Sequence, residues 1–178
     1  MHEPTHPVRS SGLAAVRSEF LALHKLESPT TAERQGRGYA LERLMVDLFE
    51  AYDLEYRKSY RLAHEQVDGS FNFRGFTYIV EIKWESTPPG FGDLAKFKAN
   101  VDGKLDSTRG LFIAMAGFDA NTVTHLVTTA RGSKNNVILM DGQDLSAIFE
   151  GLYVLPDALT AKIDAAEQEG RPWHPLGR

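Results

Sequence analysis

The segment EQVDGSFNFRGFTYIVEIKW, residues 65–84, decides how this chain folds. Both of its halves are rich in β-branched and aromatic residues at alternating positions, which is typical of strands. Arg74-Gly75 lies between them and is typical of a two-residue hairpin turn. We therefore predict two antiparallel strands, residues 65–73 and 76–84, with Phe73 opposite Phe76. Continuing that register places Asp68 opposite Glu81.

Side chains alternate between the two faces of a strand, so this hairpin has one apolar face and one polar face. On the second strand, one face carries Phe76, Tyr78, Val80, Ile82 and Trp84, and the other carries Thr77, Ile79, Glu81 and Lys83. On the first strand, Val67, Phe71 and Phe73 share one face, and Gln66, Asp68, Ser70 and Asn72 share the other. The pattern brings Asp68, Glu81 and Lys83 onto one polar patch.

The surrounding sequence predicts further elements in a simple order. Upstream we expect a helix through Leu13 and Leu23, a second helix that begins at Thr30 or Thr31 and ends near Asp53, and a strand over 55–62. Glu33 stands at capping-box distance from Thr30. Downstream we expect a helix over 93–105, a buried strand over 111–116, a helix over 121–131, a buried strand over 137–140 and a helix over 143–149. This order predicts an α/β fold with a mixed sheet and helices on both of its faces.

Length and composition limit the possible classes of function. The 178 residues suffice for one domain, and the absence of cysteine excludes disulfides, zinc–thiolate sites and thiol catalysis. The net charge of −4 argues against a polycationic nucleic-acid binder, although residues 54–134 carry more basic than acidic side chains. The sequence has no signal peptide and no apolar run long enough for a membrane span, so we expect a cytoplasmic protein without membrane contact.

Two close carboxylates beside an ammonium group suggest metal-assisted chemistry. The carboxylates repel each other unless a cation lies between them, and hard divalent ions prefer such oxygen ligands. Lys83 would orient an attacking water or stabilise charge on a phosphate. Glu42, at the edge of its helix's buried stripe, is a candidate further ligand, and Gln66 is a candidate to hold a ligand or the water. Candidate phosphate contacts are Arg37, Lys96, Lys98 and Lys104.

Each of these residues also has a structural interpretation that involves no ligand. Glu81 and Lys83 would then be a solvated strand face with a cross-strand salt bridge, and Asp68-Gly69 only a bulge or turn. Glu42 would pair with Arg34, Arg43 or Lys58. Trp84 would be a core residue rather than a base-stacking platform, and the lysines a solvated helix face.

The motif Asp68…Glu81-Ile82-Lys83 resembles the D…(D/E)xK motif of the PD-(D/E)xK nuclease superfamily. RGYALERLMVDLF (37–49) is similar to the first helix of Mrr-like restriction endonucleases, with Glu42 at its acidic position. RGLFIAMAGF (109–118) and VILMDGQDLSAIFEG (137–151) resemble the later strands and the closing helix of that group. The resemblance covers about 31–151 and departs from the pattern at Val67, where the motif's name has proline.

The resemblance implies a restriction-endonuclease-like αβββαβ core over 31–151, between an N-terminal tail and helix (1–30) and a C-terminal tail (152–178) that ends loosely at RPWHPLGR. It implies an Mg²⁺-dependent deoxyribonuclease, with Mn²⁺ as a substitute, in restriction or antiviral defence. Asp68, Glu81 and Glu42 would bind the metal, and Lys83 and Gln66 would complete the catalytic site.

We expect a homodimer, because one such site cuts one strand, and a partner surface on the N-terminal helix. The alternatives are a nuclease-fold module that binds nucleic acid or protein without cutting, and a nuclease for branched DNA or RNA.

Overall fold

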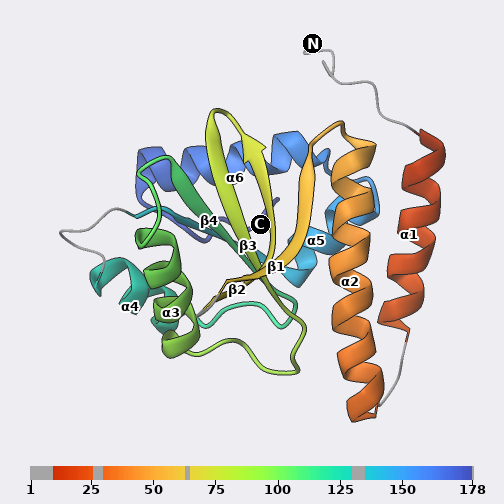
Figure 1. Ribbon diagram of the computed structural model, residues 1–178, viewed down its shortest axis with the longest axis horizontal. Coiled ribbons are helices and arrows are strands. Elements are labelled where there is room, and N and C mark those ends of the chain that lie inside the picture. Colours follow the sequence, from red (N-terminus) through yellow and green to blue (C-terminus); the bar gives the residue numbers. More distant parts are fainter. Residues whose placement is uncertain (1–9, 26–29, 63–64, 130–134, 178) are drawn as a thin grey trace.

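A computed structural model describes residues 10–25, 30–62, 65–129 and 135–177, which fold around one five-stranded sheet (Figure 1). The strands lie side by side in chain order: β1 (Tyr56–Leu62), β2 (Glu65–Phe73), β3 (Phe76–Lys83), β4 (Thr108–Ala114) and β5 (Val137–Asp141). The first three are antiparallel, whereas β4 runs parallel to β3 and β5 parallel to β4. The predicted mixed sheet is therefore confirmed.

The central hairpin forms as its turn predicts. Arg74 and Gly75 have φ angles of 51° and 82°, which the two central residues of a type I′ turn require. Phe73 pairs with Phe76, and the register continues to Gly69 opposite Val80. That register is the predicted one.

Helices cover both faces of the sheet, so the molecule has three layers. On one face pack α1 (Ser10–His24), α2 (Thr31–Ala51), α5 (Gly142–Phe149) and α6 (Leu155–Glu169), and on the other α3 (Phe91–Asp102) and α4 (Ala120–Thr129). Tyr78 and Val80 contribute to the first core and Ile79 to the second, as strand alternation predicts. None of the helices formed by the described residues is long and apolar enough to cross a bilayer.

The predicted capping box begins α2. The Glu33 backbone N–H donates to Thr30 Oγ1 at 3.3 Å, and the Thr30 N–H donates to Glu33 Oε2 at 2.7 Å. Helix α1 then packs along α2, and its Phe20 stacks on Phe149 of α5 with ring centroids 4.1 Å apart. The expected N-terminal tail before Ser10 lies outside the described residues.

Several element boundaries differ from the sequence prediction, and the starts of α3 and β4 are two of them. Helix α3 begins at Phe91 rather than Asp93, because Asp93 accepts a hydrogen bond from the Gly90 N–H and so occupies the first turn. Strand β4 begins at Thr108 rather than Leu111. Gly110 interrupts the apolar run there because a Cβ would lie 2.6 Å from the Phe97 ring and 2.8 Å from Val101, so only glycine lets α3 pack this closely.

The expectation that Val67 shares a face with Phe71 is wrong. Phe71 packs in the first core and Val67 in the second. The β2–β3 pairing ends at Gly69–Val80, so beyond that point β2 pairs with β1 alone, with Val67 opposite Tyr60.

The prediction of a loose C-terminal end is also wrong. Leu139 of β5 donates its N–H to Pro172 O at 2.8 Å, and Trp173 Nε1 donates to Asp141 Oδ2 at 3.2 Å. The Leu176 N–H donates to Asp144 Oδ1 at 2.8 Å, and its side chain is buried. Residues 172–176 are therefore part of the folded unit.

Candidate active site

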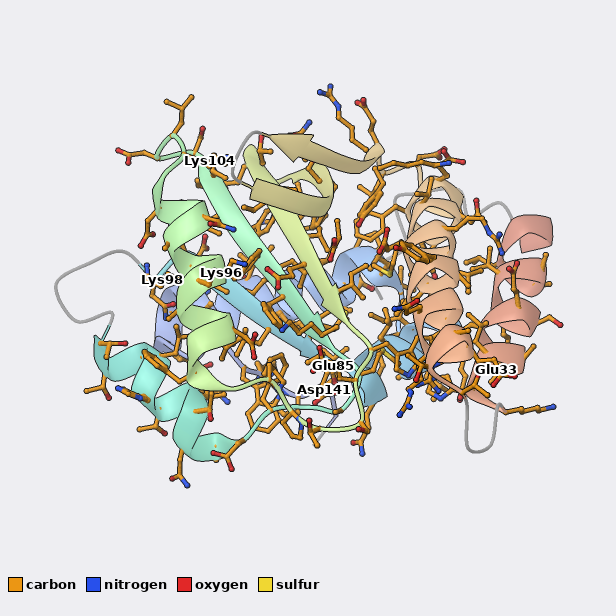
Figure 2. The ribbon with its side chains drawn as sticks, turned by 60° about the horizontal axis from the view of Figure 1, so that its bottom comes forward. Glu33, Glu85, Lys96, Lys98, Lys104 and Asp141 are labelled. Carbon is orange, nitrogen blue, oxygen red and sulfur yellow. The ribbon has the colours of Figure 1, made fainter. Side chains whose placement is uncertain are left out.

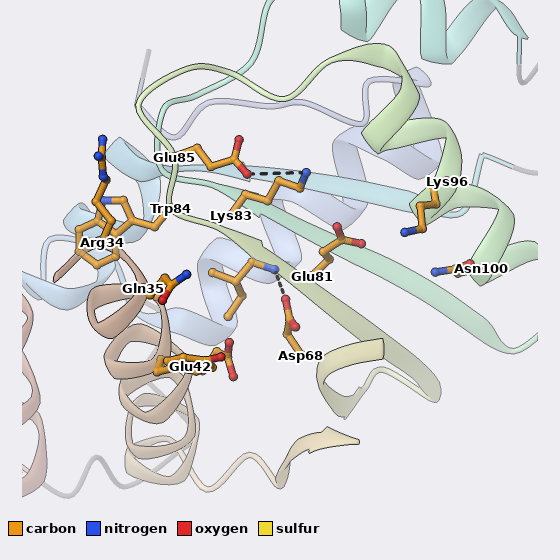
Figure 3. A pocket seen from close by; sticks show the side chains of 13 residues that line it. Arg34, Gln35, Glu42, Asp68, Glu81, Lys83, Trp84, Glu85, Lys96 and Asn100 are labelled. Carbon is orange, nitrogen blue, oxygen red and sulfur yellow. Dashed lines mark hydrogen bonds and ion pairs between the residues drawn. The ribbon is translucent and has the colours of Figure 1, made fainter. Parts of the chain in front are cut away.

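A cavity of about 540 Å³ opens at the end of β3, between α2 and α3 (Figure 3). Four of the predicted catalytic residues line it: Glu42, Asp68, Glu81 and Lys83. The other lining residues are Arg34, Gln35, Gly38 and Tyr39 from α2, Ile82, Trp84 and Glu85 from β3 and the segment after it, and Lys96 and Asn100 from α3. The lining thus comes from four elements, α2, β2, β3 and α3.

Strand β3 places Glu81 and Lys83 on the same side, toward α3. Both side chains are half-buried, and Lys83 Nζ donates to Asp93 Oδ1 at 2.6 Å, with Glu85 Oε1 farther away at 3.9 Å. The interpretation as a solvated strand face with a cross-strand salt bridge is therefore wrong, because both side chains are half-buried and the ammonium pairs with Asp93 of α3.

Asp93 keeps Lys83 charged. Burial disfavours the ammonium, but the hydrogen bond to Asp93, together with the charges of Asp93, Glu85 and Glu81, outweighs it and raises the pKa of Lys83. The same hydrogen bond lowers the pKa of Asp93. Lys83 is accordingly a fixed positive charge and hydrogen-bond donor at neutral pH.

Asp68 is held against β3 by the backbone. Its Oδ2 accepts the Ile82 N–H at 2.8 Å, which keeps the carboxylate next to Glu81 although the strand ladder ends at Gly69. Gly69 itself pairs with Lys58 and Val80 within the sheet, so the interpretation of Asp68-Gly69 as a turn is wrong. A Cβ on Gly69 would lie 2.1 Å from the Tyr56 hydroxyl, which explains the glycine.

The negative charge of Glu81 is disfavoured in the metal-free site. Burial and then the charge of Asp68 raise its pKa to about 7, against the opposing effect of Lys83 and Lys96. Two carboxylates in one half-buried place repel each other, and a divalent cation between them would remove that repulsion.

We expect Glu81→Gln to stabilise the metal-free protein, increasingly so with rising pH. The folded-state pKa lies above the ordinary value of 4.5, so wild-type stability falls as the pH rises between about 4.5 and 7. The neutral amide escapes this loss, and the difference in free energy of unfolding should reach about 1 to 2 kcal/mol at pH 8, allowing for solvent screening. Urea unfolding of both proteins with a chelator at pH 5, 6, 7 and 8 measures it. A difference that does not grow with pH would contradict the origin of the shift.

Glu42 approaches the same carboxylates from α2. Burial, and then the charge of Asp68, raise its pKa. Among the described residues it makes no ion pair with the partners considered from the sequence, and one of these, Arg43, pairs with Glu19 of α1 instead. In Figure 3 the side chains of Glu42, Asp68 and Glu81 lie in the same part of the cavity.

These donors fit a hard divalent cation that retains water. Among the described residues no three His, Asp or Glu side chains already form a compact ligand group. Mg²⁺ is usually bound through only one or two carboxylates and keeps several waters, which the pair of Asp68 and Glu81 matches. The mutual repulsion of the pair supports the same assignment.

The remaining predicted residues are the candidate phosphate contacts and Gln66, and they do not all lie at the cavity. Lys96 lines the cavity, whereas Lys98 is buried and donates to Asp102 at 2.8 Å, and Lys104 lies beyond the end of α3 (Figure 2). Because its ammonium is used inside the fold, Lys98 is not suited to contact a phosphate. Arg37 lies 4.5 Å over the Trp84 ring rather than in the cavity lining. Gln66 belongs to β2, where its backbone pairs with Arg61, but its side chain lies outside the described residues.

The most important residue that sequence reasoning missed is Asp93. An acidic residue three positions after Gly90 signals a helix start, and that signal was present. Its pairing with Lys83 depends on the path of the loop between β3 and α3, which no local pattern specifies. Tyr39 was missed as well, although it stands one turn before Glu42 on α2.

A protein family and two solved structures are similar to this chain. The chain matches the family model of the Mrr catalytic domain, a restriction endonuclease, over residues 34–149. No curated protein matches it. The crystal structure of protein VC1899 from Vibrio cholerae is similar, with a TM-score of 0.47 and 15% identity over 83% of this chain and 51% of that one. A complex of EndoMS with double-stranded DNA has a TM-score of 0.39 and 14% identity over 66% of this chain and 48% of that one.

The family match confirms the resemblance found in the sequence, and the mixed sheet between helix layers is the fold expected from it. The chain spans about half the length of the two solved structures. With its match over residues 34–149, the chain belongs to the restriction endonuclease family defined by the Mrr catalytic domain and has a nuclease fold.

Proposed function

We propose that this protein is a metal-dependent endonuclease that hydrolyses phosphodiester bonds in DNA. The observation that carries the proposal is the meeting of Asp68 and Glu81 beside the fixed ammonium of Lys83 in an open, polar cavity. Membership of the restriction endonuclease family supports it. A role in restriction or defence against foreign DNA is part of the proposal and rests on the family.

Asp68 and Glu81 would hold the divalent cation, Mg²⁺ with Mn²⁺ as a substitute, and Glu42 would add a third carboxylate from α2. When bound, the cation polarises the scissile phosphodiester and lowers the pKa of a coordinated water. The Ile82 N–H fixes Asp68 in the position needed for this. Lys83 donates a hydrogen bond to the attacking water or to the charged phosphate oxygens, and Asp93 keeps it protonated and oriented.

The catalytic unit extends over residues 31–151 in this proposal. Helices α1 and α6 pack into the same core as the sheet, so they support the unit rather than forming separate domains. One site of this kind cuts one strand. We therefore propose a homodimer for cutting a duplex, with the outer side of α1 as a candidate contact surface.

The decisive experiment replaces a proposed metal ligand and measures both metal binding and cleavage. We expect Asp68→Asn to weaken Mn²⁺ binding at least about tenfold, by isothermal titration calorimetry. Conversion of supercoiled plasmid in Mg²⁺ should slow about a thousandfold, and wild type should lose activity in a chelator. Asp164→Asn is the matched control, because Asp164 pairs with Arg74 outside the cavity.

Three results would contradict the proposal. Cleavage by Asp68→Asn at the wild-type rate would exclude Asp68 from the site. A wild-type protein that binds Mn²⁺ and DNA but cuts neither plasmid, branched DNA nor RNA would instead be a binding module. Equal binding of Mn²⁺ by both proteins would remove the basis for a metal site.

A further inference from the structure

A second, smaller cavity adjoins the candidate active site. Its volume is about 190 Å³, and its lining residues are Tyr39, Glu42, Arg43, Val46, Lys58 and Asp68. Three of these, Tyr39, Glu42 and Asp68, also line the large cavity. The two cavities thus meet at these three residues, called the shared wall below, which include two of the proposed metal-binding carboxylates.

Cations without acidic partners stand on both sides of this wall. Lys96 and Arg34 line the large cavity, on α3 and α2, and Lys58 of β1 lines the small one. Among the described residues none of these three makes an ion pair, whereas Lys83 pairs with Asp93 and Arg43 with Glu19. Cations on both sides of an acidic metal site could pair with the phosphates that precede and follow the one bound at the metal.

The shared wall also exposes an aromatic ring. Tyr39 is 70% exposed, and it is one of only three large hydrophobic side chains among the described residues that the fold leaves so open. An aromatic ring beside a backbone-binding path is suited to pack against a base or a sugar of a bound nucleic acid.

We propose that the two cavities form one continuous groove that holds a DNA backbone on both sides of the scissile phosphate. Lys96, together with Arg34, binds phosphates on one side, and Lys58 binds a phosphate on the other. The groove has no closed end at the carboxylates, so its substrate is an uninterrupted strand and no free DNA end is needed. This inference rests on the proposed function and adds to it the path of the substrate.

Two neighbouring residues of β1 provide a matched test. Lys58 pairs with Gly69 and so shares the α2-facing side of the sheet with Val80, whereas Arg57 pairs with Ser70 and shares the α3-facing side with Ile79. Both side chains are exposed, and Arg57 pairs with Glu55 away from the groove. Lys58→Ala and Arg57→Ala therefore remove one positive charge each, from opposite faces of one strand.

The measurement is the affinity for a fluorescein-labelled DNA duplex of about 30 base pairs, by fluorescence anisotropy, with Ca²⁺ in place of Mg²⁺ and at several salt concentrations. We expect Lys58→Ala and Lys96→Ala each to weaken binding about fivefold to tenfold at 0.1 M salt and to lower the slope of log affinity against log salt by about 0.9. Arg57→Ala should stay within about twofold of wild type. Thermal unfolding confirms that each variant is folded.

The outcomes separate the groove from the nuclease activity. Equal binding by Lys58→Ala and Arg57→Ala overturns the groove even if the wild type cuts plasmid in Mg²⁺. Failure of the wild type to bind the duplex overturns it as well. If binding follows the expected pattern but closed circular plasmid is not cut in Mg²⁺, the groove stands and the proposed endonuclease activity is wrong.

Discussion

Replacing Lys83 by alanine is expected to slow plasmid cleavage about a thousandfold while Mn²⁺ affinity stays within about threefold of the wild type. Lys83 is held toward the cavity by Asp93 at 2.6 Å and remains protonated, so it can donate to the water or to the phosphate. It does not supply a metal ligand, because an ammonium has no lone pair. Single-turnover cleavage and calorimetric titration with Mn²⁺ separate these two effects.

Two further variants distinguish a catalytic Lys83 from a structural one. Lys83→Arg retains the positive charge and the ion pair, but its planar fork presents donors in a different geometry, so we expect cleavage to recover only in part. Asp93→Asn leaves Lys83 unchanged but removes the negative charge of its partner. We expect cleavage to slow by only about tenfold, because the ammonium is then less well oriented. Equal cleavage by the wild type and Lys83→Ala would overturn the role of this residue.

Local patterns predicted the elements that build the site, because the hairpin and its register depend on nearby residues. The two-residue turn at Arg74-Gly75 fixes which residues of β2 and β3 oppose each other. Alternation then places Glu81 and Lys83 on one side. The capping box of α2 sets where that helix begins, and its stripe of apolar residues turns Glu42 toward the sheet.

The features that escaped prediction depend on tertiary contacts rather than on local sequence patterns. Asp93 meets Lys83 across a loop, and residues 172–176 meet β5 and α5 through hydrogen bonds to Leu139, Asp141 and Asp144. The C-terminal sequence is rich in proline and glycine, which locally indicates a loose segment. Its order comes from tertiary contacts that composition does not encode.

The ion pair beneath the C-terminal segment should have the largest effect on stability. Lys162 is fully buried, and its Nζ donates to the Asp144 carboxylate, to His174 O at 2.8 Å and to Leu139 O at 3.2 Å. Asp144 Oδ1 in turn accepts the Leu176 N–H. This one buried ammonium therefore links α6, β5, α5 and the C-terminal segment.

We expect Lys162→Met to lower the free energy of unfolding by about 3 to 5 kcal/mol and the melting temperature by roughly 10 °C. Methionine retains the apolar stem but leaves the Asp144 carboxylate buried without its cation, and two backbone carbonyls lose their donor. Urea unfolding measures the difference. Arg171→Ala is the control, because Arg171 pairs with Glu169 at the surface, and an exposed pair contributes about 1 kcal/mol or less.

The double variant Lys162→Met/Asp144→Asn identifies the uncompensated charge as the cause. Asparagine removes the buried negative charge and retains an oxygen for the Leu176 N–H, so the double variant should be about 2 kcal/mol more stable than Lys162→Met alone. If both variants unfold at the same urea concentration, lost packing rather than charge explains the destabilisation. If Lys162→Met is as stable as Arg171→Ala, the buried pair does not hold the C-terminal segment in place.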